Sequence, residues 1–149
     1  MNLRDMLERY SNLQTDIRVS ENRIHKYEKI LKRLDSEGLV KDTVSGGEGG
    51  IQHFVIEGIP IPAYSNAKSM IQMNTLKRDR LINESFEMML KVDEAIMNIS
   101  DIRIRNILSL RYLENKSWLE VANERGGENT EDGVRMLAVR YLEKIGENL

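Results

Sequence analysis

The sequence predicts an all-α protein, in which a long helical coiled-coil hairpin carries a C-terminal three-helix domain that ends in a helix-turn-helix. Two observations lead to this prediction. A heptad repeat of apolar residues opens the chain, and two helix-start signals separated by paired glycines lie near its end. The charged content of 31% is typical of long, exposed helices. We expect four regions, at residues 1–38, 39–63, 64–99 and 100–149.

The first region reads as one long coiled-coil helix, and Gly38 is expected to end it. Its seam follows a 3-4 alternation and consists of Leu3, Met6, Tyr10, Leu13, Ile17, Ser20, Ile24, Tyr27, Leu31 and Leu34. Such a seam needs a partner helix. The pattern leaves two partners open, a second helix of the same chain or a second copy in a homodimer.

Residues 39–63 read as a Gly-rich connector. The glycines at 46–50 lack the Lys-Ser/Thr of a phosphate-binding loop, so we do not expect a nucleotide site. Residues 51–57 are β-branched and aromatic enough for a small β-hairpin. Ile59 and Ile61 each precede a proline and are expected to be extended. We interpret the connector as a structured linker rather than as a contact for a partner protein.

A second long helix is expected over 64–99, beginning near Ser65 or Asn66 and reaching Asn98. Its apolar residues become denser toward the C-terminal half. They are Ile71, Leu76, Ile82, Phe86, Met89, Leu90, Val92, Ile96, Met97 and Ile99. We interpret them as the face that packs on the first helix and then enters the C-terminal core.

The C-terminal region contains the first half of the helix-turn-helix pattern. Ser117 and Glu120 have the spacing of a capping box, in which each side chain accepts from the other residue's amide. Trp118 and the apolar residues after it form a short helix, and Gly126-Gly127 stop it. For Trp118 we favour packing over base stacking.

A second helix starts at Asn129-Thr130. Its predicted buried stripe consists of Val134, Leu137, Ala138, Tyr141, Leu142 and Ile145. The opposite face consists of Arg135, Met136, Val139, Arg140 and Glu143. Two helices at a glycine-containing turn, the second presenting arginine, are the arrangement that places a recognition helix in the DNA major groove.

These residues support a family resemblance. Leu110-Arg111-Tyr112, followed by Ser117 and by Glu120-Val121-Ala122, resembles the fourth region of bacterial sigma factors. The continuation over 126–136 is similar to sigma-like proteins of phages and prophages, a group that includes the late transcription regulators ArpU and RinA. The turn is a residue or two longer than in ordinary sigma factors. The resemblance implies transcriptional regulation of prophage genes, with RNA polymerase as a partner.

The predicted DNA-binding residues cluster on and before the second helix. Arg135 is the first candidate for a base contact, because arginine pairs with guanine O6 and N7. The residues expected to line the groove with it are Thr130, Glu131, Asp132 and Met136. The residues expected at the phosphate backbone are Lys116, Ser117, Arg140 and Lys144. Residues 101–149 contain 8 Lys/Arg and 9 Asp/Glu, a net charge of −1, so one copy should bind weakly.

We expect neither an enzyme nor a cofactor or metal site, because the chain has no Cys, 2 His and no recognisable catalytic set. Without a signal sequence or transmembrane stretch, a soluble, cytoplasmic protein with no membrane partner is expected. The expected partner is double-stranded DNA. Two alternatives remain open: a phage packaging subunit that forms a ring on viral DNA, and a protein-protein adaptor that keeps the fold without DNA contact.

Overall fold

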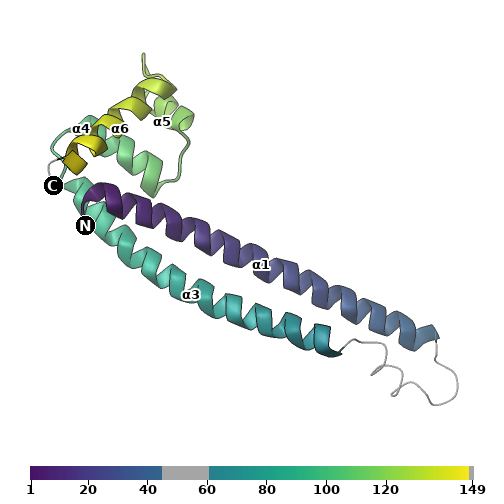
Figure 1. Ribbon diagram of the computed structural model, residues 1–149. Helices are drawn as coiled ribbons and strands as arrows, with labels where there is room; N and C mark the ends of the chain where they lie inside the picture. Colours follow the sequence, from purple (N-terminus) through teal and green to yellow (C-terminus); the bar gives the residue numbers. More distant parts are fainter. Residues whose placement is uncertain (45–60, 148–149) are drawn as a thin grey trace. The chain divides into compact units, whose positions relative to one another are not determined.

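The computed structural model describes residues 1–44 and 61–147 and confirms the all-α prediction for them. The elements are α1 (Leu3–Val44), α3 (Ile61–Met97), α4 (Ile102–Leu108), the π-helical turn η1 (Ser109–Leu113), α5 (Trp118–Arg125) and α6 (Glu131–Glu147). Helices α1 and α3 form a long hairpin (Figure 1). The chain divides into two compact units, Asp16–Leu81 and Met1–Thr15 with Ile82–Leu149. The predicted β-hairpin falls on 45–60, outside the described residues.

The coiled-coil seam predicted for α1 is confirmed. None of its ten positions is exposed, and six of them are buried. The six are Leu3, Tyr10, Leu13, Ser20, Ile24 and Leu34. Because the chain itself buries this seam, its partner is the second helix of the same chain. A homodimer therefore cannot use the seam while the hairpin is intact.

The packing face predicted for α3 is partly wrong. Val92, Ile96 and Ile99 are buried as expected. However, five of the predicted residues are exposed, and these are Leu76, Ile82, Phe86, Leu90 and Met97. The buried positions of α3 instead include small or polar residues, namely Ala67, Asn74 and Ser85. The second half of α3 has apolar residues on most of its circumference, so the density of apolar residues did not reveal which face meets α1.

The ends of the two long helices also differ from prediction. Helix α1 continues past Gly38 to Val44, since one glycine inside a helix costs only about 1 kcal/mol. Helix α3 begins at Ile61 rather than near Ser65, and it ends at Met97. Pro62 is tolerated there because the first amides of a helix have no intrahelical acceptor. Ile61 is therefore helical and not extended.

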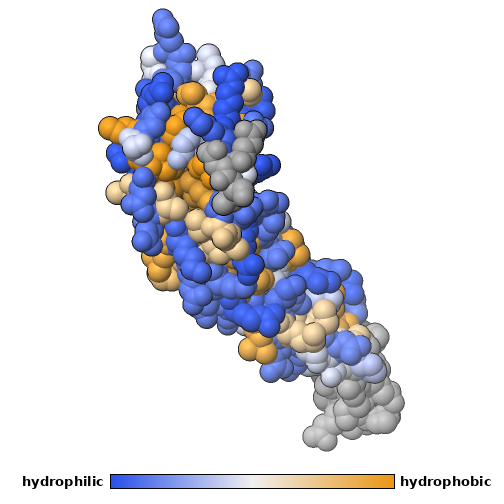
Figure 2. Space-filling model, turned by 60° about the vertical axis from the view of Figure 1, so that its left-hand side comes forward, coloured by the Kyte–Doolittle hydropathy of each residue, from blue (hydrophilic) through white to orange (hydrophobic). Residues whose placement is uncertain are grey.

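The three-helix C-terminal domain is present, with α4 and η1 together making its first helix. Asp101 caps α4 by accepting from the Arg103 amide at 2.9 Å, and the hydrogen-bonded Arg103 guanidinium holds the pKa of this carboxyl below its ordinary value. The buried side chains of this domain are all apolar: Ile104, Ile107, Leu108, Val121, Ala122, Val134, Ala138 and Leu142. On the face shown in Figure 2, hydrophobic side chains gather mainly over these C-terminal helices. No helix within the described ranges is long and apolar enough to cross a membrane.

Candidate DNA-binding helix-turn-helix

Helix α5 starts where the sequence predicts, at the Ser117 cap. The Ser117 hydroxyl accepts from the Glu120 amide at 3.2 Å, and this satisfies one of the free amides of the first turn. Among the described residues the Ser117 amide donates no hydrogen bond to the Glu120 carboxylate, so only half of the predicted capping box forms. The Ser117 hydroxyl, which was predicted to lie at the phosphate backbone, therefore accepts a hydrogen bond at the start of α5.

The paired glycines form the turn between α5 and α6. Gly126 has φ 68° and Gly127 has φ 63°, a left-handed region that side chains with a Cβ avoid. The Gly126 amide donates to the Ala122 and Asn123 carbonyls, which ends α5. The Asn129 side-chain amide then donates to the Gly126 carbonyl at 2.7 Å and closes the turn. Backbone conformation, rather than lack of space, therefore requires glycine here, because a Cβ at either position would meet nothing within 4 Å.

Helix α6 is capped by Thr130, as the start signal predicts. The Thr130 hydroxyl accepts from the Gly133 amide at 3.0 Å. A Cβ added at Gly133 would lie 2.9 Å from this hydroxyl oxygen, so the glycine makes room for the cap. This role of Gly133 was not predicted from the sequence. The spacing of three residues between Thr130 and Gly133 is the feature of the sequence from which this contact could have been predicted.

The inner stripe of α6 is the one that the sequence predicts, whereas Met136 and Val139 of the predicted outward face are half-buried. Every residue of the expected inner stripe is buried or half-buried, while Arg135 and Arg140 are exposed. At 100° per residue the two arginines lie about 140° apart around the helix. They therefore border the outward face, and the residues between them are Asp132, Met136, Val139 and Glu143.

Carboxylates surround the first turn of α6. Asp132 and Glu131 are both exposed, and the Asp132 Oδ1 lies 3.5 Å from the Arg135 guanidinium. The Arg135 side chain is 47% exposed in this pair, so it is accessible. Acidic side chains at this end stabilise the helix through its dipole. They would also repel a phosphate, so this turn suits a base edge better than the DNA backbone.

The segment before α5 is held by its own ion pair. Lys116 Nζ contacts the Glu124 carboxylate of α5, and this hydrogen bond raises the pKa of the lysine. Lys116 is therefore less available for a phosphate than predicted. Lys144, by contrast, is exposed on α6, and no described residue forms an ion pair with it.

Arg111 holds the segment before α5 against the domain, and this role was not predicted from the sequence. Its guanidinium lies 4.7 Å from the centre of the Trp118 ring and donates to the Lys116 carbonyl at 3.1 Å. Trp118 is half-buried beneath it. This cation–π contact supports the packing interpretation of Trp118 over base stacking.

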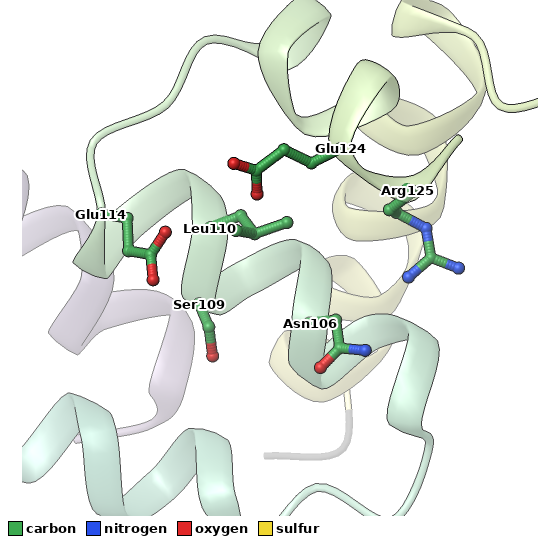
Figure 3. Close-up of a pocket in the computed structure, with 6 residues that line it drawn as sticks. All are labelled: Asn106, Ser109, Leu110, Glu114, Glu124 and Arg125. Carbon is green, nitrogen blue, oxygen red and sulfur yellow. The ribbon is translucent and has the colours of Figure 1, made fainter.

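A polar hollow of about 460 Å³ lies on another part of the domain (Figure 3). Its lining residues come from α4, η1, α5 and the residue after η1, and they are Asn106, Ser109, Leu110, Glu114, Glu124 and Arg125. None of the predicted DNA-binding residues lines this hollow. In the described part of the chain, no group of three or more His, Asp or Glu side chains is placed to hold a metal ion.

Comparisons with protein-family models, with curated proteins and with solved structures found no match to this chain. The resemblance to sigma-like regulators therefore depends on the motif residues alone.

Proposed function

We propose that this protein binds double-stranded DNA through α5 and α6 and regulates transcription. One observation carries the proposal. Helix α6 follows a short capped helix across a two-glycine turn, buries its apolar stripe and leaves Arg135 and Arg140 accessible at the borders of its outward face. This is the arrangement in which the second helix of a helix-turn-helix enters the major groove.

The composition of the outward face suggests what each residue contacts. Arg135 is near the start of α6, where recognition helices reach base edges, and it can pair with guanine. The half-buried Met136 and Val139 offer their remaining exposed apolar surface to a thymine methyl group, and the exposed Asp132 can accept from a cytosine amino group. Arg140 and Lys144 follow toward the helix end and are proposed to contact phosphates. To pair with a base, Arg135 must first give up its ion pair with Asp132, and this loss reduces the net gain in DNA affinity from the base contact.

Affinity for DNA is expected to depend on assistance. The net charge of −1 over 101–149 provides little sequence-independent attraction to phosphates. A second copy or RNA polymerase would supply the missing binding energy. The resemblance to phage and prophage regulators suggests control of prophage genes in the bacterial cytoplasm as the biological setting, and this belongs to the same proposal.

The test begins with selection of bound fragments from genomic DNA, with and without RNA polymerase. Binding of a selected duplex is then titrated by fluorescence anisotropy. Arg135→Ala should weaken specific binding by ~1–3 kcal/mol, or about 5- to 150-fold, if this arginine reads a base. Arg23→Ala, an exposed arginine of α1, is the matched control and should leave the affinity unchanged.

Salt dependence separates the two classes of contact. Arg140→Ala should reduce the slope of log affinity against log salt by about 1 and weaken all sequences alike. If no duplex is retained at low salt, with or without polymerase, the DNA proposal is wrong.

An adaptor function is the second candidate, and the carboxylates of the first turn of α6 favour it. Glu131, Asp132 and Glu128 are exposed together beside the turn. A basic protein surface would meet them with opposite charge, whereas DNA would not. Failure to retain DNA, together with salt-sensitive binding of RNA polymerase, would favour this candidate.

A further inference from the structure

Helix α3 presents an apolar surface that no described part of the chain covers. Ile82, Phe86, Leu90 and Met97 are 44%, 57%, 51% and 62% exposed. All four belong to the unit that includes Ile82–Leu149. We call these four residues the outer stripe of α3. All four are among the ten residues that the sequence predicts to pack on the first helix or in the C-terminal core.

Helix geometry keeps the outer stripe away from α1. Leu90 follows the buried Met88 by two residues, which is about 200° around the helix, so it lies on the back of α3. Ile82 and Phe86 each follow a buried residue by one position, about 100° around the helix. The stripe therefore extends from one side of α3 to its back, and α1 cannot cover it without abandoning its own buried seam.

The apolar area of the stripe matches that of a protein interface. At roughly 180 Å² for a fully exposed large apolar side chain, the four exposed fractions give about 400 Å² on one copy. A standard interface buries about 800 Å² per partner, of which about 57% is apolar, or roughly 450 Å². Ile82, Phe86 and Leu90 alone give about 270 Å², so the stripe supplies more than half of the apolar part of a standard interface. A second copy presents the same area, as a two-fold interface requires.

We propose that two copies of this chain associate through their outer stripes, with the two α3 helices antiparallel. The flanks of the stripe differ, and this difference sets the direction. Ile82 and the half-buried Met89 lie along one flank, whereas Glu87 and Glu94 lie exposed along the other. Antiparallel helices place like flanks together, so the apolar flanks of the two copies meet and the Glu87 and Glu94 carboxylates stay at the wet rim, while the exposed Asp93 lies within the stripe.

A parallel pair would oppose the apolar flank of each copy to the carboxylates of the other and would desolvate them without a partner. In the antiparallel pair, rim repulsion between carboxylates is screened by water, and the exposed Lys91 lies between Glu87 and Glu94 along the helix. The register that packs Phe86 against Leu90 of the second copy also brings Asn83 opposite Asp93. This interface is separate from the hairpin seam and from α6.

The first test measures the mass of the full chain by sedimentation equilibrium over a concentration series, without DNA. The wild type should show a reversible dimer, and Leu90→Gln should raise the dissociation constant of this dimer at least tenfold. Leu119→Gln is the matched control, because Leu119 is 54% exposed on α5 and lies outside the stripe. Circular dichroism checks that each variant keeps its helices, as expected for exposed positions. A wild-type monomer, a closed ring or equal effects of the two variants would overturn the proposal.

The second test fixes the direction of the helices. The chain has no native cysteine, so Asn83→Cys and Asp93→Cys proteins can be mixed and oxidised. The antiparallel pair predicts a disulfide between the two different variants. It predicts little cross-linking of Asn83→Cys with itself, since those positions would be about 15 Å apart, beyond the ~7 Å limit for a disulfide. Self-cross-linking of each variant would instead show a parallel pair. Because neither test uses DNA, the result is independent of the proposed function.

Discussion

The hairpin and the helix-turn-helix domain bury different kinds of side chain. All three polar side chains that are buried among the described residues, Ser20, Asn74 and Ser85, belong to the two hairpin helices. The buried side chains of α4, α5 and α6 are entirely apolar. Ser85 accepts from the Gln14 side chain at 2.9 Å, so the hairpin contains polar contacts from helix to helix. The domain core has no comparable contact within the residues that the structure covers.

This difference indicates two ways of specifying structure. Buried apolar side chains contribute the larger stabilisation, and they interlock only by shape. A buried polar side chain contributes less but penalises any shift that leaves it unpaired, so it fixes the register of long helices. We infer that the domain provides most of the stability of its unit, while the contact between Gln14 and Ser85 keeps α1 and α3 aligned.

The largest expected effect comes from a cavity in the apolar core. Ile107→Ala removes a side chain that is 0% exposed and should cost about 4 kcal/mol. Ile24→Ala in the hairpin should cost about 2 kcal/mol, because two helices can close a gap more easily than a three-helix core. Denaturant unfolding followed by fluorescence of Trp118, the only tryptophan, reports the domain, and circular dichroism reports all helices. If Ile107→Ala and Ile24→Ala lowered the free energy of unfolding equally, the domain core would not be the more stabilising of the two regions.

A smaller effect is expected at the start of α6. Thr130→Ala removes the cap on the Gly133 amide and should cost about 1 kcal/mol. Thr15→Ala is the control in the hairpin, where the hydroxyl donates to the Ser11 carbonyl in the middle of a helix. Alanine is the better helix former there, so this variant should be neutral or slightly more stable. Thermal unfolding compares the two, and an equal loss would show that the cap has no special role.

The sequence predicted those features that a local pattern determines. The seam of α1, the Ser117 and Thr130 caps and the inner stripe of α6 all follow from spacing within one helix. The face of α3 did not, because that helix is apolar on several sides and only its partner selects one. The Asp132 pair with Arg135 and the Arg111 contact with Trp118 were missed for a related reason: composition shows which charges are present and gives no information on which of them meet.

A buried polar position in the hairpin should respond in the opposite direction to the core. Asn74 is 5% exposed, and its amide donates to the Met70 carbonyl of its own helix at 2.7 Å. Asn74→Leu replaces this local bond with apolar burial and should raise the stability of the hairpin by ~0.5–1 kcal/mol. Thermal unfolding measures the gain. A loss of stability would mean that the hydrogen bond of Asn74 contributes more to folding than apolar burial at this position.

The smallest expected effect appears in alkaline solution, and it compares one tyrosine from each region. Burial raises the pKa of Tyr112 in η1 and of Tyr10 in α1 above the ordinary value, with the Arg111 charge partly opposing the shift at Tyr112. A pKa that is higher in the folded state gives a stabilisation that is complete below the unfolded pKa of about 10 and is lost as pH rises through the folded pKa.

Tyr112→Phe should therefore flatten the alkaline loss of domain stability, and Tyr10→Phe should do the same for the first turns of α1. The ultraviolet absorbance of tyrosinate, titrated alongside unfolding, measures both shifts. If either tyrosine ionises at its ordinary pKa while the protein is folded, that side chain is accessible to water. The region around it would then be more open than its packing indicates.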